Sequence, residues 1–451
     1  MHAGSRDIEI TIVTRQAPVR PSVPALPQVP WLFAVWMGAS AVVAVGAGLV
    51  LGILAALESG VGAERWTQAV QAHGRLQLFG FVAVFVVALG FEFAMRLYQR
   101  PPFPAAVRAG VPAMLGLGAI LQAAGQVWYD SIGFLVLPGS LLSIAGAVAF
   151  AVVVLRIPTM RSISIDPQPY YFRAAALWLA AAALLGAWAL ARTDEGVINL
   201  VESHAVAELF LRGFILNIVV AIALRAFVGH LGLELLSSRR QLAIFVALNA
   251  STVAWLAGQG LGALPAAIWL ARLADITLAG SLLLFTAWFR VLTPLRRGIR
   301  EPRYEWLVPL AWSAVVVYAV VLAGVAIAGA DPSLYQEGAI RHTFLLGFMI
   351  PLMIGMAHVV LARFGVGAVP WENALTAGFL LAFLAWPLRV LPVTFSDAPG
   401  DIGRAVLATS GFMLMAALVL VAVVSLRTAV LVRRRVAAIM ARHTARHAHA
   451  H

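Results

Sequence analysis

The 451-residue sequence contains no cysteine and no lysine, and only 12% of its residues are charged. Without cysteine the chain can form no disulfide, no Cys-ligated zinc site and no iron–sulfur cluster. Any bound metal or cofactor must therefore be held by histidine, methionine, carboxylate or backbone groups, and the ten histidines are the candidate ligands. The sequence also has no Gly-rich phosphate loop, Ser–His–Asp pattern or zinc-protease motif, so ATP-driven chemistry has no support.

What the sequence does contain is apolar. Hydrophobic residues make up 62% of the chain, and its mean hydropathy is +0.91. A soluble domain of this composition would lack the polar surface needed to cover it, so we expect an all-α polytopic membrane protein. A hydrocarbon core of about 30 Å needs about 20 apolar residues per helix. Twelve such runs occur, at about 31–57, 71–97, 107–126, 131–155, 173–192, 202–228, 240–260, 265–290, 305–329, 338–363, 371–393 and 402–430.

The net charge of +12 comes entirely from arginine, and its distribution indicates membrane sidedness rather than nucleic-acid binding. Arginines concentrate in the tails and the even-numbered loops, whereas the odd-numbered loops are richer in acidic residues. Positive charge favours the cytoplasmic side, so both termini are expected in the cytoplasm. The sequence thus divides into a Pro-rich segment over 1–30, a membrane domain over 31–430 and an Arg/His-rich tail over 431–451.

One pattern recurs three times: a histidine, an apolar stretch, and a Gly-Phe pair that leads into an apolar helix. The copies are His73 with Gly80-Phe81, His204 with Gly213-Phe214, and His342 with Gly347-Phe348. Their spacings of 131 and 138 residues predict three pseudo-repeated four-helix units, at about 31–155, 173–290 and 305–430. Each histidine then lies near the start of the second helix of its unit, toward the extracytoplasmic face. Around a pseudo-threefold axis the three would converge.

An ionisable side chain within a membrane span is costly, so it is a functional candidate by default. Three histidines at one depth are the strongest such set. Neutral imidazole ligates both haem iron and copper, and a helical bundle can enclose a porphyrin. The set therefore indicates haem ligation, or haem plus copper, by His73, His204 and His342. The alternative is that these are helix-end residues hydrogen-bonded at the membrane interface.

The sixth expected helix carries a second signal. His204, Glu208 and Arg212 are spaced i, i+4, i+8 and so lie along one face. Glu208 could orient His204 or relay a proton, with Arg212 tuning it. The competing interpretation is an internal ion pair that makes both charges tolerable.

On the second expected helix, Gln77 lies one turn below His73, and Arg75 points to another side. Gln77 is a candidate to support the ligand role of His73 from the next turn. Arg75 could hold a haem propionate in a charge-assisted pair, or it could extend to the lipid headgroups.

Other histidines have simpler interpretations. His358 follows His342 by sixteen residues, about 24 Å along a helix, so the two cannot share one metal. His358 and His230 belong to the cytoplasmic half, where an interfacial role is expected. The remaining tail histidines are expected to be solvated; they are His443, His447, His449 and His451.

The motif His73-x-Arg75-x-x-Leu78-Phe79-Gly80-Phe81 resembles the helix beginning His-Ala-His-Glu-Met-Leu-Phe-Gly-Phe of the NnrS family. These are haem- and copper-containing bacterial membrane proteins associated with the response to nitric oxide. Arg341-His342-x-x-x-x-Gly347 is similar to that family's later Arg-His-Ala-x-x-x-Gly. Arg75 and Leu76 stand where the family has histidine and glutamate. The resemblance implies a protein of the bacterial inner membrane that binds haem, with copper as a further metal.

The layout of twelve helices also resembles the catalytic subunit of haem–copper oxidases, in which helices 2, 6 and 10 bring histidines toward the outer side. The sequence lacks the oxidase's His-Pro-x-x-Tyr segment on helix 6, and Gln241 to Gly260 contain no histidine. The oxidases' three-histidine copper site cannot be assembled here, so oxygen reduction is not expected.

We therefore expect an NnrS-like haem or haem–copper protein of nitric-oxide metabolism or nitrosative-stress tolerance. His73 and His342 would be the axial ligands and His204 a third ligand or copper residue. Its partners would be membrane lipid, nitric oxide and a redox partner. The alternative is a transporter or channel whose histidines and charges line a pathway between helical repeats. A structural membrane protein that has lost its haem sites is a third option.

Overall fold

The computed structural model describes residues 31–97, 103–157, 167–193, 195–260, 264–293, 304–364, 369–394 and 399–448. The segment predicted over 1–30 lies outside these residues. Twelve helices are long and apolar enough to cross a membrane, and no strand occurs in the described part of the chain. The prediction of an all-α polytopic membrane protein with twelve spans is confirmed. The three-unit repeat stays a prediction.

Spans 1 to 4 cover the first third of the chain. Span 1 is α1 (Trp31–Val43), η1 (Ala44–Leu49) and α2 (Val50–Ala56); α3 (Val61–Glu64) follows; span 2 is α4 (Trp66–Arg75), η2 (Leu76–Ala83) and α5 (Val84–Leu97); span 3 is α6 (Ala105–Val127); span 4 is α7 (Tyr129–Ile132), η3 (Gly133–Leu135) and α8 (Val136–Leu155).

Spans 5 to 12 complete the bundle. Span 5 is α9 (Gln168–Ala191); span 6 is α10 (Leu200–Glu208), η4 (Leu209–Ile215) and α11 (Leu216–Leu231); spans 7, 8 and 9 are α12 (Ser238–Gly260), α13 (Pro265–Phe289) and α14 (Tyr304–Ala328); span 10 is α15 (Leu334–His342), η5 (Thr343–Met349) and α16 (Ile350–Phe364); spans 11 and 12 are α17 (Glu372–Thr394) and α18 (Asp401–Ala448).

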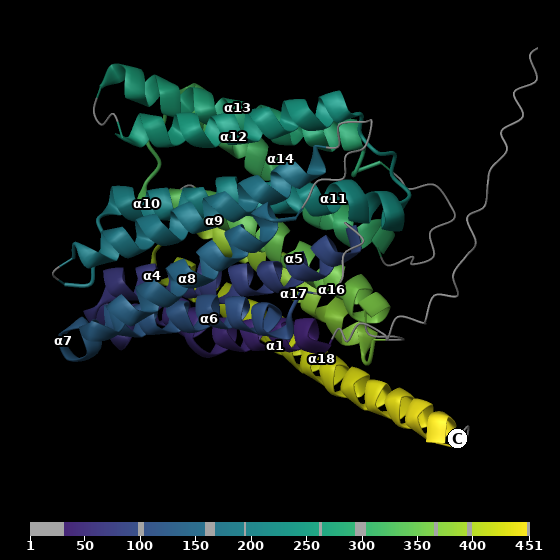
Figure 1. Cartoon of the computed structure of the whole chain (residues 1–451). Coiled ribbons are helices and arrows are strands. Elements are labelled where there is room, and N and C mark those ends of the chain that lie inside the picture. Colours follow the sequence, from purple (N-terminus) through teal and green to yellow (C-terminus); the bar gives the residue numbers. More distant parts are fainter. Residues whose placement is uncertain are drawn as a thin grey trace, which may run out of the picture.

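Spans 2, 6 and 10 form the interior of the bundle. In their most apolar 18-residue stretches, 100%, 78% and 94% of the residues are buried, whereas the other nine spans reach at most 50%. A helix that is apolar on all sides needs protein rather than lipid or water around it, so these three spans lie inside and the others surround them. The end of the bundle at which spans 2, 6 and 10 begin is here called the outer end; it lies at the left of Figure 1, with α4, α7 and α10.

Each of these three inner spans widens into a π-helical segment soon after its histidine: η2 after His73, η4 after His204 and η5 after His342. Each segment contains the Gly-Phe pair of the recurring motif. A π turn is uncommon and often marks a functional site, because one extra residue must be accommodated within the helix. The motif seen in the sequence therefore coincides with a shared irregularity of the backbone.

Glycines in these segments admit side chains of neighbouring spans. A Cβ at Gly213 would lie 2.5 Å from the Trp178 side chain of α9, and one at Gly347 would lie 2.8 Å from Ala314 of α14. Because real Cβ atoms do not approach so closely, glycine is required for this packing.

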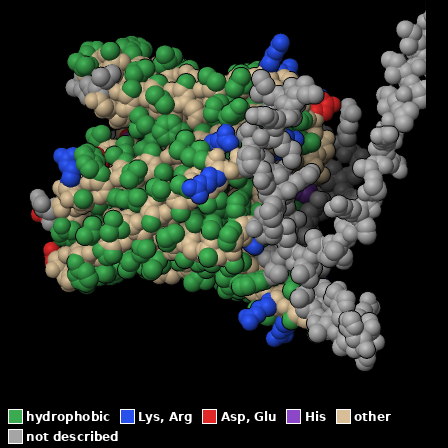
Figure 2. Space-filling view, viewed as in Figure 1, with side chains coloured by type: hydrophobic (Ala, Val, Ile, Leu, Met, Phe, Trp, Pro, Cys, Tyr) green, Lys and Arg blue, Asp and Glu red, His purple; other side chains and the backbone are tan. Residues whose placement is uncertain are grey.

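The flank of the bundle is hydrophobic, and arginine side chains on the visible face lie mainly toward the end opposite the outer end (Figure 2). The α12–α13 pair lies along one edge, and α18 runs beyond the bundle (Figure 1). The tail expected from residue 431 continues this helix, which does not end until Ala448.

Candidate functional site

His73 lies near the end of α4 and packs against span 1. Its Nδ1 is 2.7 Å from the carbonyl oxygen of Gly48, in the π-helical segment η1. The ring fits because Gly52 has no side chain: a Cβ there would lie 2.6 Å from Nδ1 of His73. One turn further, Gln77 donates from Nε2 to the carbonyl of Ala44 at 3.3 Å. Two successive turns of span 2 thus dock on span 1.

His342 is held by its own helix. Its Nδ1 is 2.6 Å from the carbonyl oxygen of Gly338, one turn earlier. A carbonyl oxygen can only accept a hydrogen bond, so in both His73 and His342 the proton is assigned to Nδ1. The lone pair is then on Nε2, which has no hydrogen-bond partner in the described part of the chain. This is the arrangement in which metal-ligating histidines are commonly held.

His73 and His342 are close to one another. They lie near enough to interact electrostatically, and both interact with Arg389 of α17. Seven residues before each histidine, or two helical turns, stand Trp66 and Tyr335, which therefore lie on the same faces of α4 and α15. Their ring centroids are 6.2 Å apart. The two helices thus bring both the aromatic pair and the histidine pair together.

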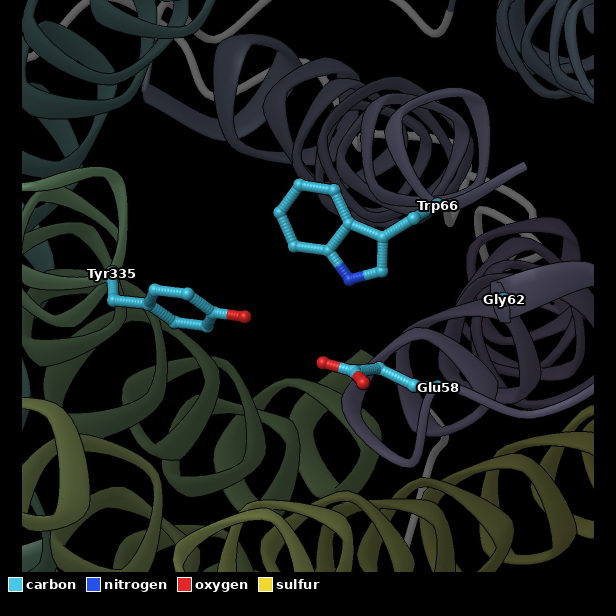
Figure 3. Close-up of a pocket in the computed structure, with 4 residues that line it drawn as sticks. All are labelled: Glu58, Gly62, Trp66 and Tyr335. Atoms are coloured by element: carbon cyan, nitrogen blue, oxygen red, sulfur yellow. The ribbon is translucent and has the colours of Figure 1, made fainter. Parts of the chain in front are cut away.

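A pocket of about 360 Å³ opens beside the aromatic pair, lined by Glu58, Gly62, Trp66 and Tyr335. Figure 3 shows the Tyr335 hydroxyl, the Glu58 carboxylate and the Trp66 indole turned toward one another. Glu58 is also 2.6 Å from Nη1 of Arg404, at the start of α18. Cofactor and ligand sites have volumes of about 300–1,000 Å³, so this pocket is large enough to admit a ligand. Because Trp66 and Tyr335 precede the two histidines by two helical turns, we call the pocket the mouth of the histidine site.

Arg389 is a residue that the sequence analysis missed. Trp386, one turn before it, donates to the Thr343 hydroxyl at 3.3 Å. Val390 and Tyr335 both pack against the buried cluster that contains Ala339. These contacts place Arg389 at the level of the residues just before His342. Its signal in the sequence is a lone arginine within an apolar span, between Pro387 and Pro392.

His204 belongs to a separate charged network. Glu208 accepts a hydrogen bond from Nε of Arg212 at 2.7 Å and one from Nε of Arg341 at 3.3 Å. Arg212 continues to Asp275 of α13, with Nη1 and Oδ1 2.6 Å apart. Arg341 also donates to Glu337 at 3.0 Å. The network therefore joins spans 6, 8 and 10, and the pairing of Glu208 with Arg212 predicted from their spacing is present.

His204 faces two of these carboxylates. Nε2 lies 3.5 Å from Glu208 and Nδ1 lies 3.5 Å from Glu337, while the ring packs on Trp255 with centroids 5.2 Å apart. Both nitrogens thus face carboxylate oxygens of the network. No described contact joins His204 to His73 or His342, so its role as a third ligand stays a prediction.

The network has a buried and an accessible part. The side chains of Glu208 and Arg212 are 6% and 4% exposed, whereas those of His204, Asp275, Glu337 and Arg341 are 20–26% exposed. Three carboxylates face two guanidinium groups here. Protons and ions can reach such a site more readily than they can reach a sealed ion pair.

Arg75 points away from the histidine pair. It is buried, it donates from Nη1 to Oε1 of Gln122 in α6 at 2.5 Å, and it faces Gly186 of α9. The role of Arg75 as a propionate ligand stays a prediction, and Arg389 is the arginine near enough to act electrostatically on both histidines.

The half of the bundle opposite the outer end holds the remaining candidates. His358 is buried, and its Nδ1 lies 3.7 Å from a carboxylate oxygen of Glu372. His230 is near the end of α11. Between spans 2, 6 and 10 this half also contains an apolar cavity of about 40 Å³, lined in part by Met349, Met353 and Met356.

No protein-family model matches the chain, and no curated protein matches it. Within the described residues no three His, Asp or Glu side chains form a group that could hold a metal ion. The resemblance to the NnrS family therefore rests on the two motifs alone, and copper stays a prediction.

Proposed function

We propose that this multi-pass membrane protein is an NnrS-like haem protein of the bacterial inner membrane, with His73 and His342 as the two axial ligands. The observation that carries the proposal is that the two imidazole rings are held in the same way. Each has Nδ1 fixed by a backbone carbonyl and Nε2 without a partner among the described residues, and the two rings lie near enough to influence one another electrostatically. In this proposal both termini are cytoplasmic and the ligand pair lies toward the extracytoplasmic face.

The chemistry of the two histidine rings suits such a group. Haem iron takes two neutral imidazoles as axial ligands, and the interior of a helical bundle provides the apolar surroundings that a porphyrin needs. Fixing Nδ1 sets the direction of each ring before the cofactor arrives, which reduces the entropy lost on binding. When bound, the haem would supply one-electron chemistry, and its iron could coordinate nitric oxide only by releasing one of the two imidazoles. Copper is the second candidate metal, since imidazole ligates it as well.

The proposed role is in nitric-oxide metabolism or nitrosative-stress tolerance, through ligand binding or electron transfer with a redox partner. This part of the proposal rests on the resemblance of the motifs around His73 and His342 to those of the NnrS family.

A transporter or channel is the second candidate, and the charged network favours it. Spans 6, 8 and 10 place Glu208, Arg212 and Asp275 within the membrane region, and four of the six network side chains reach the surface. Charges of this kind commonly line ion or proton pathways.

Absorption spectra of the purified protein test the haem proposal. The protein is expressed with sufficient haem, purified in detergent, and its oxidised and reduced spectra and metal content are measured. We expect a Soret band in the wild type and its loss, or a large shift of the visible bands, in His73→Ala and His342→Ala. His204→Ala should retain the band, because its ring faces carboxylates.

A colourless, metal-free wild type would end the haem proposal and leave the transporter as the function to test. Loss of the Soret band only in His204→Ala would indicate that the haem ligand lies in the charged network instead.

A further inference from the structure

Arg389 differs from the other arginines near the outer end. The described partners of those arginines are carboxylates, an amide or a carbonyl: Arg65 with Asp130, Arg75 with Gln122, Arg192 with Glu202, Arg212 with Glu208 and Asp275, Arg272 with the carbonyl of Gly329, Arg341 with Glu208 and Glu337, and Arg404 with Glu58 and Asp401. Arg389 has no ion pair and no hydrogen bond among the described residues.

Arg389 is partly buried, and its guanidinium lies in a membrane span with no carboxylate or hydrogen-bond partner among the described residues. A full charge in such a place is unfavourable unless it is balanced. Arginine keeps its charge in proteins, so it cannot escape this cost by losing its proton. Since no described carboxylate approaches Arg389, an anion from outside the chain is the partner that would balance it.

The surroundings of Arg389 leave a route for such an anion. The residue follows Trp386, which bonds to Thr343, and precedes Val390, which packs against the same buried cluster of Ala339, Val393 and Leu407 as Tyr335 does. Tyr335 lines the 360 Å³ pocket at the outer end, together with Glu58 and Trp66 (Figure 3). Arg389 therefore lies at the junction between this mouth and the two histidines.

We propose that Arg389 binds a carboxylate or a comparably small oxyanion between the outer pocket and the pair His73 and His342. A planar guanidinium matches the two oxygens of a carboxylate with two parallel hydrogen bonds, which lysine cannot do. The carboxylate has two possible sources. One is a propionate of a bound porphyrin, in which case the inference rests on the proposed function; the other is a free oxyanion that enters through the mouth.

Haem and its dimethyl ester distinguish the two sources, because the ester keeps the porphyrin and iron but lacks both free carboxylates. We would titrate each into the purified apoprotein by absorption, for wild type, Arg389→Met and Arg389→Lys. If a propionate is the ligand, the wild type should prefer haem to the ester by about tenfold or more. Arg389→Met should lose this preference, and Arg389→Lys should retain part of it.

In the second arm, acetate and nitrate are added to the apoprotein, and the unfolding temperature is measured. A free oxyanion site predicts stabilisation of the wild type by these anions, none of Arg389→Met, and no preference for haem over the ester. This arm is readable even if neither porphyrin binds, so failure of the proposed function and failure of this inference are distinguishable.

Arg192→Met is the matched control, since it removes an exposed arginine near the same end of the bundle and should change neither result. Size-exclusion profiles and circular dichroism establish that each variant is folded. The inference is overturned if wild type and Arg389→Met behave alike in both arms, or if Arg75→Met rather than Arg389→Met abolishes the preference for haem.

Discussion

At the scale of single residues, the histidine pair is positioned by main-chain groups. His73 uses a carbonyl of span 1, and His342 uses a carbonyl of its own helix. Such partners cannot be removed by changing one side chain, so the ring directions should tolerate most nearby substitutions. The position most sensitive to substitution is Gly52, because its missing side chain leaves the space that the His73 ring occupies.

Gly52→Ala should displace the His73 ring, because the new Cβ would lie 2.6 Å from Nδ1 and 2.7 Å from Cε1. Loss of a positioning contact commonly weakens metal affinity about 10–100-fold, and we expect a fall of that order in haem affinity. Titration of the apoprotein with haem measures it. Gly46→Ala, in the same span and with no atom within 4 Å of the new Cβ, is the control. Equal haem affinity in the two variants would contradict the ligand role of His73.

At this scale the sequence indicated candidate residues but not their partners. Ionisable groups inside apolar runs drew attention to His73, His204 and His342, and the same rule should have marked Arg389. The sequence did not show that His204 lies apart from His73 and His342. His204 is paired with Glu337, 133 residues away, and such long-range neighbours follow from how spans pack rather than from spacing along one helix.

At the scale of elements, the charged network fixes three spans to one another. Arg212 of span 6 binds Glu208 of the same span and Asp275 of span 8, and Glu208 also binds Arg341 of span 10. Removing one member of a buried pair leaves an uncompensated charge, which is more costly than losing the pair.

Glu208→Gln should therefore lower the free energy of unfolding by about 3–5 kcal/mol, because it leaves Arg212 and Arg341 with less compensation. The double variant Glu208→Gln with Arg212→Met should be less destabilised than the sum of the single variants. Unfolding in mixed detergent and SDS, followed by circular dichroism, provides the values. Strict additivity would show that the two side chains do not interact.

The close packing at a glycine of the π-helical segment η4 leads to a second prediction. Gly213→Ala should destabilise the bundle by about 1–3 kcal/mol, since its Cβ would overlap the Trp178 side chain at 2.5 Å. Gly229→Ala lies in the same span, where a Cβ meets no atom within 4 Å, and should be close to neutral. The same unfolding assay compares the two. A neutral Gly213→Ala would indicate that α9 can move away from η4.

The sequence did not predict the π-helical segments, although it drew attention to the residues within them. A π turn has the same composition as an α turn, and it depends on neighbours such as Trp178 and Ala314 that only the folded bundle brings near. Span 2 was expected from residue 71, but it begins at Trp66, because polar residues at its start continue the helix.

At the scale of the whole molecule, twelve spans were predictable because a membrane imposes a minimum length on apolar helices. The interior position of spans 2, 6 and 10 agrees with the recurring motif that placed histidines on those same three spans. The grouping into three units was not testable from the arrangement, because packing alone does not show that the units are equivalent.

The orientation can be tested by labelling. Since the chain has no cysteine, single replacements Ser131→Cys and Ser237→Cys provide unique thiols on exposed residues at opposite ends of the bundle. In intact cells or spheroplasts, an impermeant maleimide should label Ser131→Cys, whereas Ser237→Cys should react only after permeabilisation. The opposite pattern would place the histidine pair on the cytoplasmic side and reverse the proposed topology.

The last helix spans more than the bilayer. α18 runs over 48 residues, about 72 Å, roughly twice the thickness of a hydrocarbon core. Its first turn holds Glu58 through Arg404 at the rim of the outer pocket, and its last turns carry exposed Arg433, Arg434 and Arg435 beyond the opposite end. Because α18 is one continuous helix, the rim of the outer pocket and the arginine end belong to a single element.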